Sequence, residues 1–175
     1  MLLTNHVVSG ALIGALARRP RSAFAAGVAS HFVLDAVPHW GDWGSRRRFL
    51  RVAMADGLVS LAVAAAFTAA SPAERRPAVL AGMAGAALPD LDKPTKLWFG
   101  RSPFPAAVDR FHSHIQREAW HRRYVEAVVA ATLVPAALTA LRGSAPGAEA
   151  RWPALRPPRQ VAGTAGRPGR PGRRG

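Results

Sequence analysis

Five groups of His and Asp residues lie inside or beside apolar, helix-forming stretches of this 175-residue chain. The groups are His6; His31, Asp35 and His39; Asp56; Asp90 and Asp92; and His112 and His114. Ionisable side chains in apolar surroundings are costly unless they are paired, hydrogen-bonded or bound to a metal. The pattern therefore predicts that the groups converge on one site, and imidazole with carboxylate is a ligand set for a divalent metal ion.

The amino-acid composition narrows the choice of metal. The chain contains no Cys, so thiolate ligands are excluded and any metal must be held by His nitrogen and carboxylate oxygen. Because imidazoles contribute, we expect Zn or Mn rather than Ca. Such an ion lowers the pKa of a bound water and stabilises phosphoryl oxygens, which favours hydrolysis of a phosphoester.

The segment from His31 to His39 has the most suggestive spacing. His31 and Asp35 are four residues apart, so on a helix they share one face. Pro38 ends that helix, which places His39 just beyond it. We expect this segment to supply metal ligands, and a capped helix end with satisfied polar groups is the alternative.

Asp90 and Asp92 come just after an apolar, Ala-rich and Gly-rich helix. In an extended or turn segment both carboxylates can point the same way and hold a metal. A turn fixed by the flanking prolines is the alternative.

His112 and His114 cannot both face one side of a straight helix. His114, Glu118 and His121 share a face if the helix continues, so Glu118 is a candidate ligand or general base. The alternative is an amphipathic polar face, since several Arg residues crowd the same segment.

Asp56 interrupts an otherwise apolar run of nineteen residues, 52–70. An ionisable group in such a run is a functional candidate, and Asp56 is the second candidate base. A hydrogen bond to Ser60 or to the backbone is the alternative. His6 lies in a first helical turn, where it is expected to stay neutral and suit metal ligation, and Thr4 or Asn5 is predicted to cap that helix.

The hydropathy pattern predicts an all-α bundle of five or six helices that is associated with a membrane. Helices are expected from the Thr4/Asn5 cap to residue 17 and over 22–36, 47–70, 77–88 and 109–123, the last continuing or kinking into 125–141. Residues 93–104 are expected to form a loop. The segments 52–70 and 125–141 are the favoured bilayer insertions.

The last fifth of the chain differs from the rest. We expect residues 1–141 to form the helical domain and residues 142–175, with eight Arg and one Glu, to be a disordered Arg/Pro/Gly-rich tail. The tail is interpreted as a solubilising extension that at most contacts anionic lipid. Nucleic acid is not an expected partner, because Trp152 is the tail's lone aromatic residue.

The chain resembles the bacterial membrane-bound metal-dependent hydrolase family of the YdjM type. The resemblance lies in the order of four motifs over residues 4–118: T-N-H, H-F-V-L-D-A-V-P-H-W, A-L-P-D-L-D and F-H-S-H. The resemblance implies a helical protein of the bacterial inner membrane with a metal site. The chain is more distantly similar to zinc-dependent phospholipase C and P1-type nucleases. Those enzymes use a His-x3-Asp motif followed by Pro and His, and later a His-x3-Glu motif. Here the first motif is matched by His31, Asp35 and His39, and the second by His114 and Glu118.

The sequence supports two hypotheses. The first is a metal-dependent hydrolase that acts on a phosphoester near membrane lipid, with Arg46, Arg47 and Arg48 holding an anionic headgroup. Its expected ligands are His31, Asp35, Asp90 and His114, followed by His6, Asp92 and His112. The second is a non-catalytic integral membrane protein whose His/Asp clusters fix helix packing.

Overall fold

The computed structural model describes residues 1–17, 19–41 and 44–143. These residues form seven α-helices and two 3₁₀ turns: α1 Leu3–Leu16, α2 Pro20–Ala36, α3 Arg46–Ala70, α4 Arg76–Ala87, η1 Leu88–Leu91, α5 Asp92–Phe99, α6 Ala106–Ile115, η2 Trp120–Arg122 and α7 Arg123–Gly143. The predicted all-α bundle is confirmed. The predicted tail lies, from residue 144 onward, outside the described residues.

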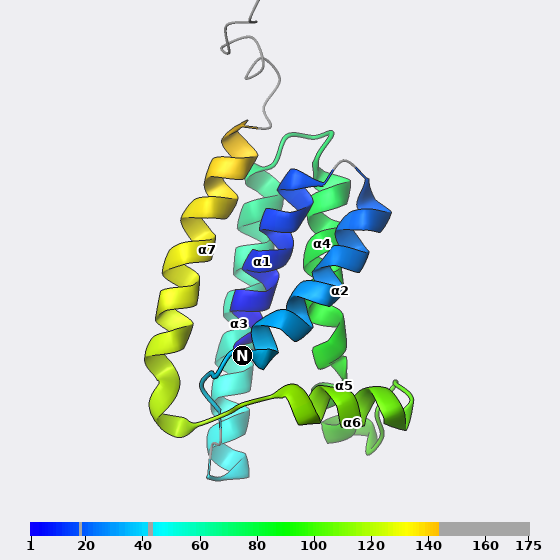
Figure 1. Ribbon diagram of the computed structural model, residues 1–175, viewed down its shortest axis with the longest axis vertical. Coiled ribbons are helices and arrows are strands. Elements are labelled where there is room, and N and C mark those ends of the chain that lie inside the picture. The colour runs from blue at the N-terminus through cyan, green and yellow to red at the C-terminus, as the bar shows by residue number, and fades with distance from the viewer. Residues whose placement is uncertain (18, 42–43, 144–175) are drawn as a thin grey trace, which may run out of the picture.

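Helix α1 is the centre of the bundle, and it contacts α2, α3, α4 and α7 (Figure 1). Its buried face packs against α4, α3 and α7 in a single apolar core. The core contains Val7, Val8, Ala11, Ala15, Phe67, Val79, Met83, Ala137 and Leu141. Helices α5 and α6 lie across the lower end of this bundle, crosswise to the long helices.

Glycines let α1 and α4 approach closely. A Cβ added to Gly10 would lie 2.6 Å from the Cα of Met83 and would also meet the carbonyl group of Gly82. Small residues at such contacts bring helix backbones together. The consequence is that the start of α1, which carries His6, is held near the end of α4, which leads directly into η1 and Asp90.

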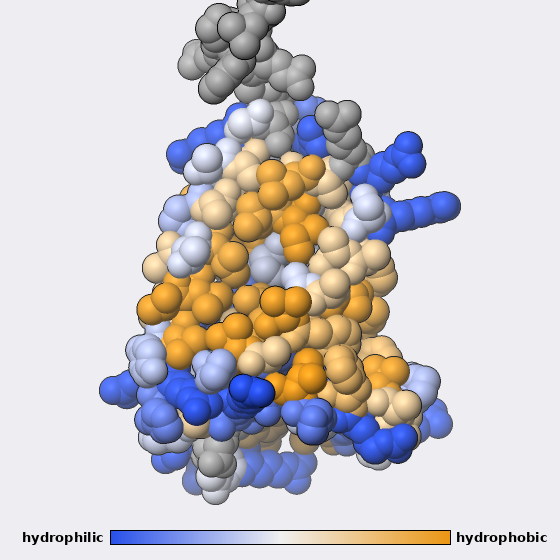
Figure 2. Space-filling model, viewed as in Figure 1, coloured by the Kyte–Doolittle hydropathy of each residue, from blue (hydrophilic) through white to orange (hydrophobic). Residues whose placement is uncertain are grey.

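Helices α3 and α7 are long and apolar enough to cross a membrane, by length and composition. At about 1.5 Å per residue, the 25 residues of α3 extend roughly 37 Å, against about 30 Å for a bilayer's hydrocarbon core. Only 11% of the apolar stretch within α3 and 17% of the one within Trp120–Gly143, which contains α7, are buried inside the protein. Figure 2 shows the corresponding apolar surface over the middle of the bundle, with hydrophilic residues at its two ends.

Two predicted boundaries are wrong at the lower end of the bundle. Residues 92–99 form α5 instead of a loop, and α5 ends at Gly100, whose φ of 70° suits a residue without a side chain. The helix predicted over 109–123 ends at Ile115. The chain then runs extended because it pairs with the segment after α2: the His39 amide donates to the Arg117 carbonyl (3.2 Å), and the Ala119 amide donates to the His39 carbonyl (3.0 Å).

Candidate metal centre

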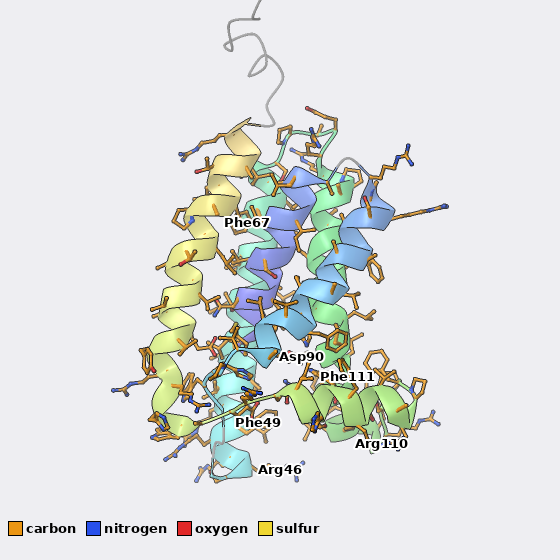
Figure 3. All side chains as sticks on the ribbon, in the orientation of Figure 1. Arg46, Phe49, Phe67, Asp90, Arg110 and Phe111 are labelled. Carbon is orange, nitrogen blue, oxygen red and sulfur yellow. The ribbon has the colours of Figure 1, made fainter. Side chains whose placement is uncertain are left out.

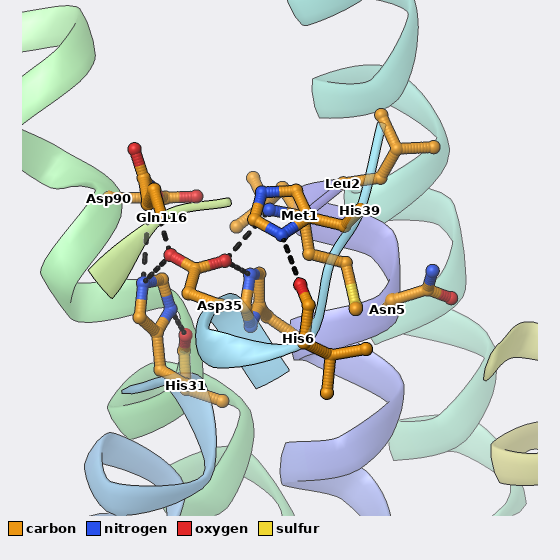
Figure 4. A network of polar contacts seen from close by, with 12 residues as sticks. Met1, Leu2, Asn5, His6, His31, Asp35, His39, Asp90 and Gln116 are labelled. Carbon is orange, nitrogen blue, oxygen red and sulfur yellow. Dashed lines mark hydrogen bonds and ion pairs between the residues drawn. The ribbon is translucent and has the colours of Figure 1, made fainter. Parts of the chain in front are cut away.

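Four of the predicted ligands meet at the lower end of the bundle. His31 and Asp35 come from the last turns of α2, Asp90 from η1 and His112 from α6. Each offers one ligand atom, and these atoms all lie within 4.8 Å of one another. Figure 4 shows His31 and Asp90 on the same side of the Asp35 carboxylate. This group could hold a metal ion.

The spacing of these atoms suits a single coordination shell. The Nε2 atoms of His31 and His112 lie 3.2 and 3.0 Å from Oδ2 of Asp35 and 3.1 Å from each other. Oδ1 of Asp90 lies 3.7 Å from both Nε2 atoms. Ligand atoms that sit about 2.0–2.1 Å from a tetrahedral Zn²⁺ are roughly 3.3–3.4 Å apart. These five separations lie within a few tenths of an ångström of that spacing, and all four atoms lie within 4.8 Å of one another.

Two backbone carbonyls fix which imidazole nitrogens are free to bind. Nδ1 of His31 lies 2.7 Å from the carbonyl oxygen of Ala86, and Nδ1 of His39 lies 2.7 Å from that of Val37. A carbonyl only accepts hydrogen bonds, so each Nδ1 carries a proton and donates it. In the neutral rings Nε2 then keeps its lone pair, and this is how ligating histidines are oriented in metal sites.

The two acidic ligands are held in their charged forms. Burial alone would raise the pKa of the Asp35 carboxyl, but hydrogen bonding, with the bond from His112 the largest contribution, holds this pKa well below its usual range. Burial also works to raise the pKa of Asp90, and the nearby Lys93 ammonium, 2.8 Å from its Oδ1, lowers it instead. Anionic carboxylates are the forms that bind a cation.

His6 lies on the other side of the Asp35 carboxylate. Its Nε2 is 3.2 Å from Oδ1 of Asp35, and its ring stacks on that of His31 with the centroids 4.0 Å apart. The α-amino group of Met1 lies 2.7 Å from the same oxygen. Asp35 therefore presents one oxygen to His31 and the other to His6 (Figure 4).

Several buried polar atoms around this group make no hydrogen bond within the described part of the chain. They are both ring nitrogens of His6, Nε2 of His39, Oδ1 of Asp92 and Oδ1 of Asp90, the last of which instead has ion-pair contacts with Lys93, His31 and His112. Leaving a buried polar atom without a hydrogen bond costs about 1–3 kcal/mol. Such atoms are rare in native proteins, and a bound ion is one of their physical explanations.

Asp92 and Glu118 flank the four-residue group. Oδ1 of Asp92 lies 4.0 Å from Nδ1 of His112, on the ring side away from Asp35, and its Oδ2 pairs with Lys96 (2.8 Å). Oε1 of Glu118 lies 3.8 Å from Nε2 of His39, and its side chain is 35% exposed. Glu118 thus stands between the buried imidazole and solvent.

His114 lies apart from the other predicted ligands. It is exposed and borders a surface recess with Asp109 and Arg110. The interpretation that His114, Glu118 and His121 share a helix face is wrong, because α6 ends at Ile115. The structure brings His112 into the group instead.

Asp56 does not reach the metal group. Its carboxylate accepts hydrogen bonds from the backbone amides of Leu3 (2.6 Å) and Thr4 (3.2 Å), and Ser60 donates to its carbonyl oxygen. This is the hydrogen-bonding alternative that the sequence left open. The predicted cap by Thr4 or Asn5 is wrong, because α1 begins at Leu3 without a capping side chain of its own and Asp56 of α3 takes that role.

Sequence reasoning missed Glu126 and Gln116. Glu126 of α7 is buried and accepts from the Leu2 amide (3.2 Å), the Asn5 side chain (2.7 Å) and the Trp40 amide (3.2 Å). Its signal was an acidic residue within an apolar run, the same signal that drew attention to Asp56. The side-chain amide of Gln116 donates to Oδ2 of Asp35 at 2.9 Å, and nothing in its sequence context marked it.

A groove of about 820 Å³ opens between α3 and α7 beside the candidate metal centre. Arg48, Arg51 and Arg123 line it together with Trp40 and Trp120, and the remaining wall is mostly apolar but includes the acidic residues Asp56 and Glu126. The Arg48 guanidinium lies 4.7 Å from the centre of the Trp120 ring, within cation–π range. Leu2 and Asn5 on the wall of the groove are sequence neighbours of Met1 and His6, which both lie against the Asp35 carboxylate.

Comparison with family models, curated proteins and solved structures finds no match to this chain.

Proposed function

We propose that this protein is a metal-dependent hydrolase of the bacterial inner membrane that cleaves a phosphoester. The observation that carries the proposal is the convergence of four ligand atoms at coordination spacing, beside buried polar atoms that lack hydrogen bonds. His31, Asp35, Asp90 and His112 are the proposed ligands, and Zn or Mn is the proposed metal because two of the four are imidazoles. The exposed apolar lengths of α3 and α7 support the membrane location.

The residues around the centre have separate proposed roles. A divalent ion held there supplies a bound water of lowered pKa and a positive charge for phosphoryl oxygens. Glu118, at the solvent side of His39, is the proposed base that accepts the proton of the attacking water. Asp56 is not assigned a chemical role, because its carboxylate is engaged by the first turn of α1.

The groove between α3 and α7 supports an anionic lipid-like substrate. Its three Arg side chains can hold a phosphate, and its apolar wall can take an acyl chain. A volume of about 820 Å³ lies in the range of small-molecule sites. Arg48 thus keeps the headgroup role expected from the sequence, and the groove adds Arg51 and Arg123.

The first experiment is metal analysis of the full chain purified in mild detergent. Wild type and the matched control His114→Ala are expected to retain a transition metal, whereas His31→Ala and His112→Ala are expected to lose it. Hydrolysis of aryl phosphomonoesters, phosphodiesters and phospholipids is measured on the same samples. Absence of any transition metal from the wild type, with no thermal shift on adding Zn²⁺ or Mn²⁺, would contradict the metal site.

A non-catalytic membrane protein is the second candidate, and one observation favours it. His112 of α6 contacts Asp35 of α2 at 3.0 Å, so the same residues also fasten α6 to the bundle. In that case the metal-ligand variants lose thermal stability, and the wild type hydrolyses none of the phosphoesters even when loaded with metal.

A further inference from the structure

Helices α5 and α6 form an arm that carries unusually exposed aromatic residues. Trp98 and Phe99 at the end of α5 are 73% and 72% exposed, and Phe111 of α6 is 52% exposed. Large exposed apolar side chains gathered on one part of a protein mark an interaction site. The contacts of α6 with the bundle run mainly to α2, so most of its surface is open.

The side chains of α6 are sorted by polarity around the helix. Val108, Phe111 and Ile115 are spaced by three and four residues and therefore lie along one face. Figure 3 shows Phe111 pointing toward the bundle and Arg110 pointing away from it, below the lower end. Phe111 also meets Phe32 of α2 edge-on, with the ring centroids 5.3 Å apart.

The direction of α6 matches this sorting. Helices α3 and α7 run along the length of the bundle, and α6 lies across its lower end (Figure 1). If α3 and α7 cross a bilayer, α6 lies parallel to the membrane plane. The apolar surface in Figure 2 reaches down toward the level of the arm, where it meets a hydrophilic belt. Aromatic residues favour this level of a membrane, and an amphipathic helix lies in it.

We propose that α5 and α6 form an interfacial arm that docks on the headgroup layer of the same bilayer that α3 and α7 cross. Phe111 and Val108 contact the upper acyl region, and Arg110 remains in water. Arg101 and Arg110, both exposed, supply positive charge for anionic lipid headgroups. This inference rests on the proposed membrane insertion and adds where the site stands relative to the lipid.

The arm links the lipid surface to the candidate metal centre. His112, one of the four proposed ligands, follows Phe111 directly on α6. A helix that rests on the bilayer through Phe111 therefore holds His112 at the level of the headgroups. The substrate class that this placement favours is a phosphoester in a lipid headgroup, rather than a soluble phosphate ester.

The test uses the absence of native Cys, which makes single-cysteine labelling specific. Phe111→Cys, Arg110→Cys and Leu58→Cys are each labelled with a nitrobenzoxadiazole probe in the full chain and reconstituted into nanodiscs. Leu58 lies in the middle of α3 and is 69% exposed, so its probe reports insertion itself. Quenching is measured with lipids spin-labelled near the headgroup or deep in the acyl chain, and with aqueous iodide.

We expect the probe at 58 to be quenched by the deep label, and the probe at 111 by the shallow label. The probe at 110 is expected to be quenched by iodide. Because Phe111 touches Phe32, Val108→Cys serves as a second variant on the same face, and helicity by circular dichroism confirms that each variant is folded.

Two results separate the inference from the proposed function. In the first, the deep label quenches the probe at 58, but iodide quenches the probes at 108 and 111 as strongly as the probe at 110. The arm then does not lie in the interface, although the protein is inserted. If the probes at 108, 110 and 111 are all quenched by lipid alone, the amphipathic placement is wrong. If iodide quenches the probe at 58, membrane insertion fails and the inference fails with it.

Discussion

Asp35 and Asp56 are both acidic residues within apolar helices, but their surroundings differ in kind. The carboxylate of Asp56 accepts hydrogen bonds from two backbone amides and from the Thr4 hydroxyl at the start of α1. The carboxylate of Asp35 meets imidazoles from three elements. Around Asp56 the donors and acceptors match, whereas around Asp35 several buried nitrogens are left without hydrogen bonds.

The partners of a buried acid indicate whether it belongs to a structural contact or to a ligand site. Glu126 resembles Asp56, because its two oxygens accept from the backbone amides of Leu2 and Trp40 and from the side chain of Asn5. Together Asp56 and Glu126 place negative charge at the positive end of α1. Asp35 also accepts hydrogen bonds at both oxygens, so what separates it from these two acids is its imidazole neighbours, of which His6 has ring nitrogens without hydrogen bonds.

The largest expected effect is that of Asp35→Asn. The substitution keeps the size of the side chain but removes the charge that His31 and His112 surround, so we expect bound metal and any hydrolysis to be lost. Metal content by mass spectrometry checks this. Asp56→Asn is the matched control and should retain the metal; equal metal content in both variants would break the distinction between the two acids.

Asp56→Ala should destabilise the fold while sparing the metal site. It leaves the amides of Leu3 and Thr4 without their acceptor, which costs about 1–3 kcal/mol. The free energy of unfolding in detergent and the metal content are measured together. A variant of unchanged stability that has lost its metal would move Asp56 into the site and overturn its structural role.

Removing the metal should change the thermal stability of the Asp35 and Asp56 variants differently. An ion that binds only the folded protein stabilises it by about 2.7 kcal/mol when present at a hundredfold excess over its dissociation constant. Chelation should therefore lower the thermal midpoint of the wild type and of Asp56→Asn. The midpoint of Asp35→Asn should not change, and an equal fall in all three proteins would indicate that the chelator acts elsewhere.

Asp92→Asn is expected to have a smaller effect. Asp92 stands 4.0 Å behind Nδ1 of His112, the position from which an outer carboxylate orients a ligating imidazole. Loss of such a partner typically weakens metal binding about 10–100-fold without abolishing it. Metal titration measures the affinity, and Asp109→Asn, which removes the other carboxylate that pairs with Lys96, is the control.

The sequence could predict the parts of the site that depend on local spacing. His31 and Asp35 form a pair because four residues on a helix return to the same face, and this holds whatever the helix packs against. The choice between His112 and His114 could not be made in the same way. It depends on where α6 ends and on which of its faces meets α2, and both are set by pairing between His39 and the segment after Ile115.

Asp56 shows the same limit from the other side. An acid in an apolar run predicts that a partner exists, but its partners here are amides some fifty residues away in sequence. The α5 helix was missed because Asp92–Phe99 contains a proline near its start, where a helix tolerates it, and ends at a left-handed glycine. The broad pattern of apolar helices was sufficient for the all-α bundle.

The smallest expected effect is that of His114→Ala, and this variant tests which face of α6 meets the bundle. His114 is exposed and contacts none of the proposed ligands, whereas His112, two residues earlier, is buried and lies 3.0 Å from Asp35. We therefore expect His114→Ala to leave the metal content and the free energy of unfolding within about 0.5 kcal/mol of wild type, as for most exposed substitutions. His112→Ala, made in parallel, should lose the metal. Because a shift of α6 by half a turn would exchange the two positions, the reverse outcome would place His114 in the site and turn His112, with its neighbour Phe111, away from the bundle.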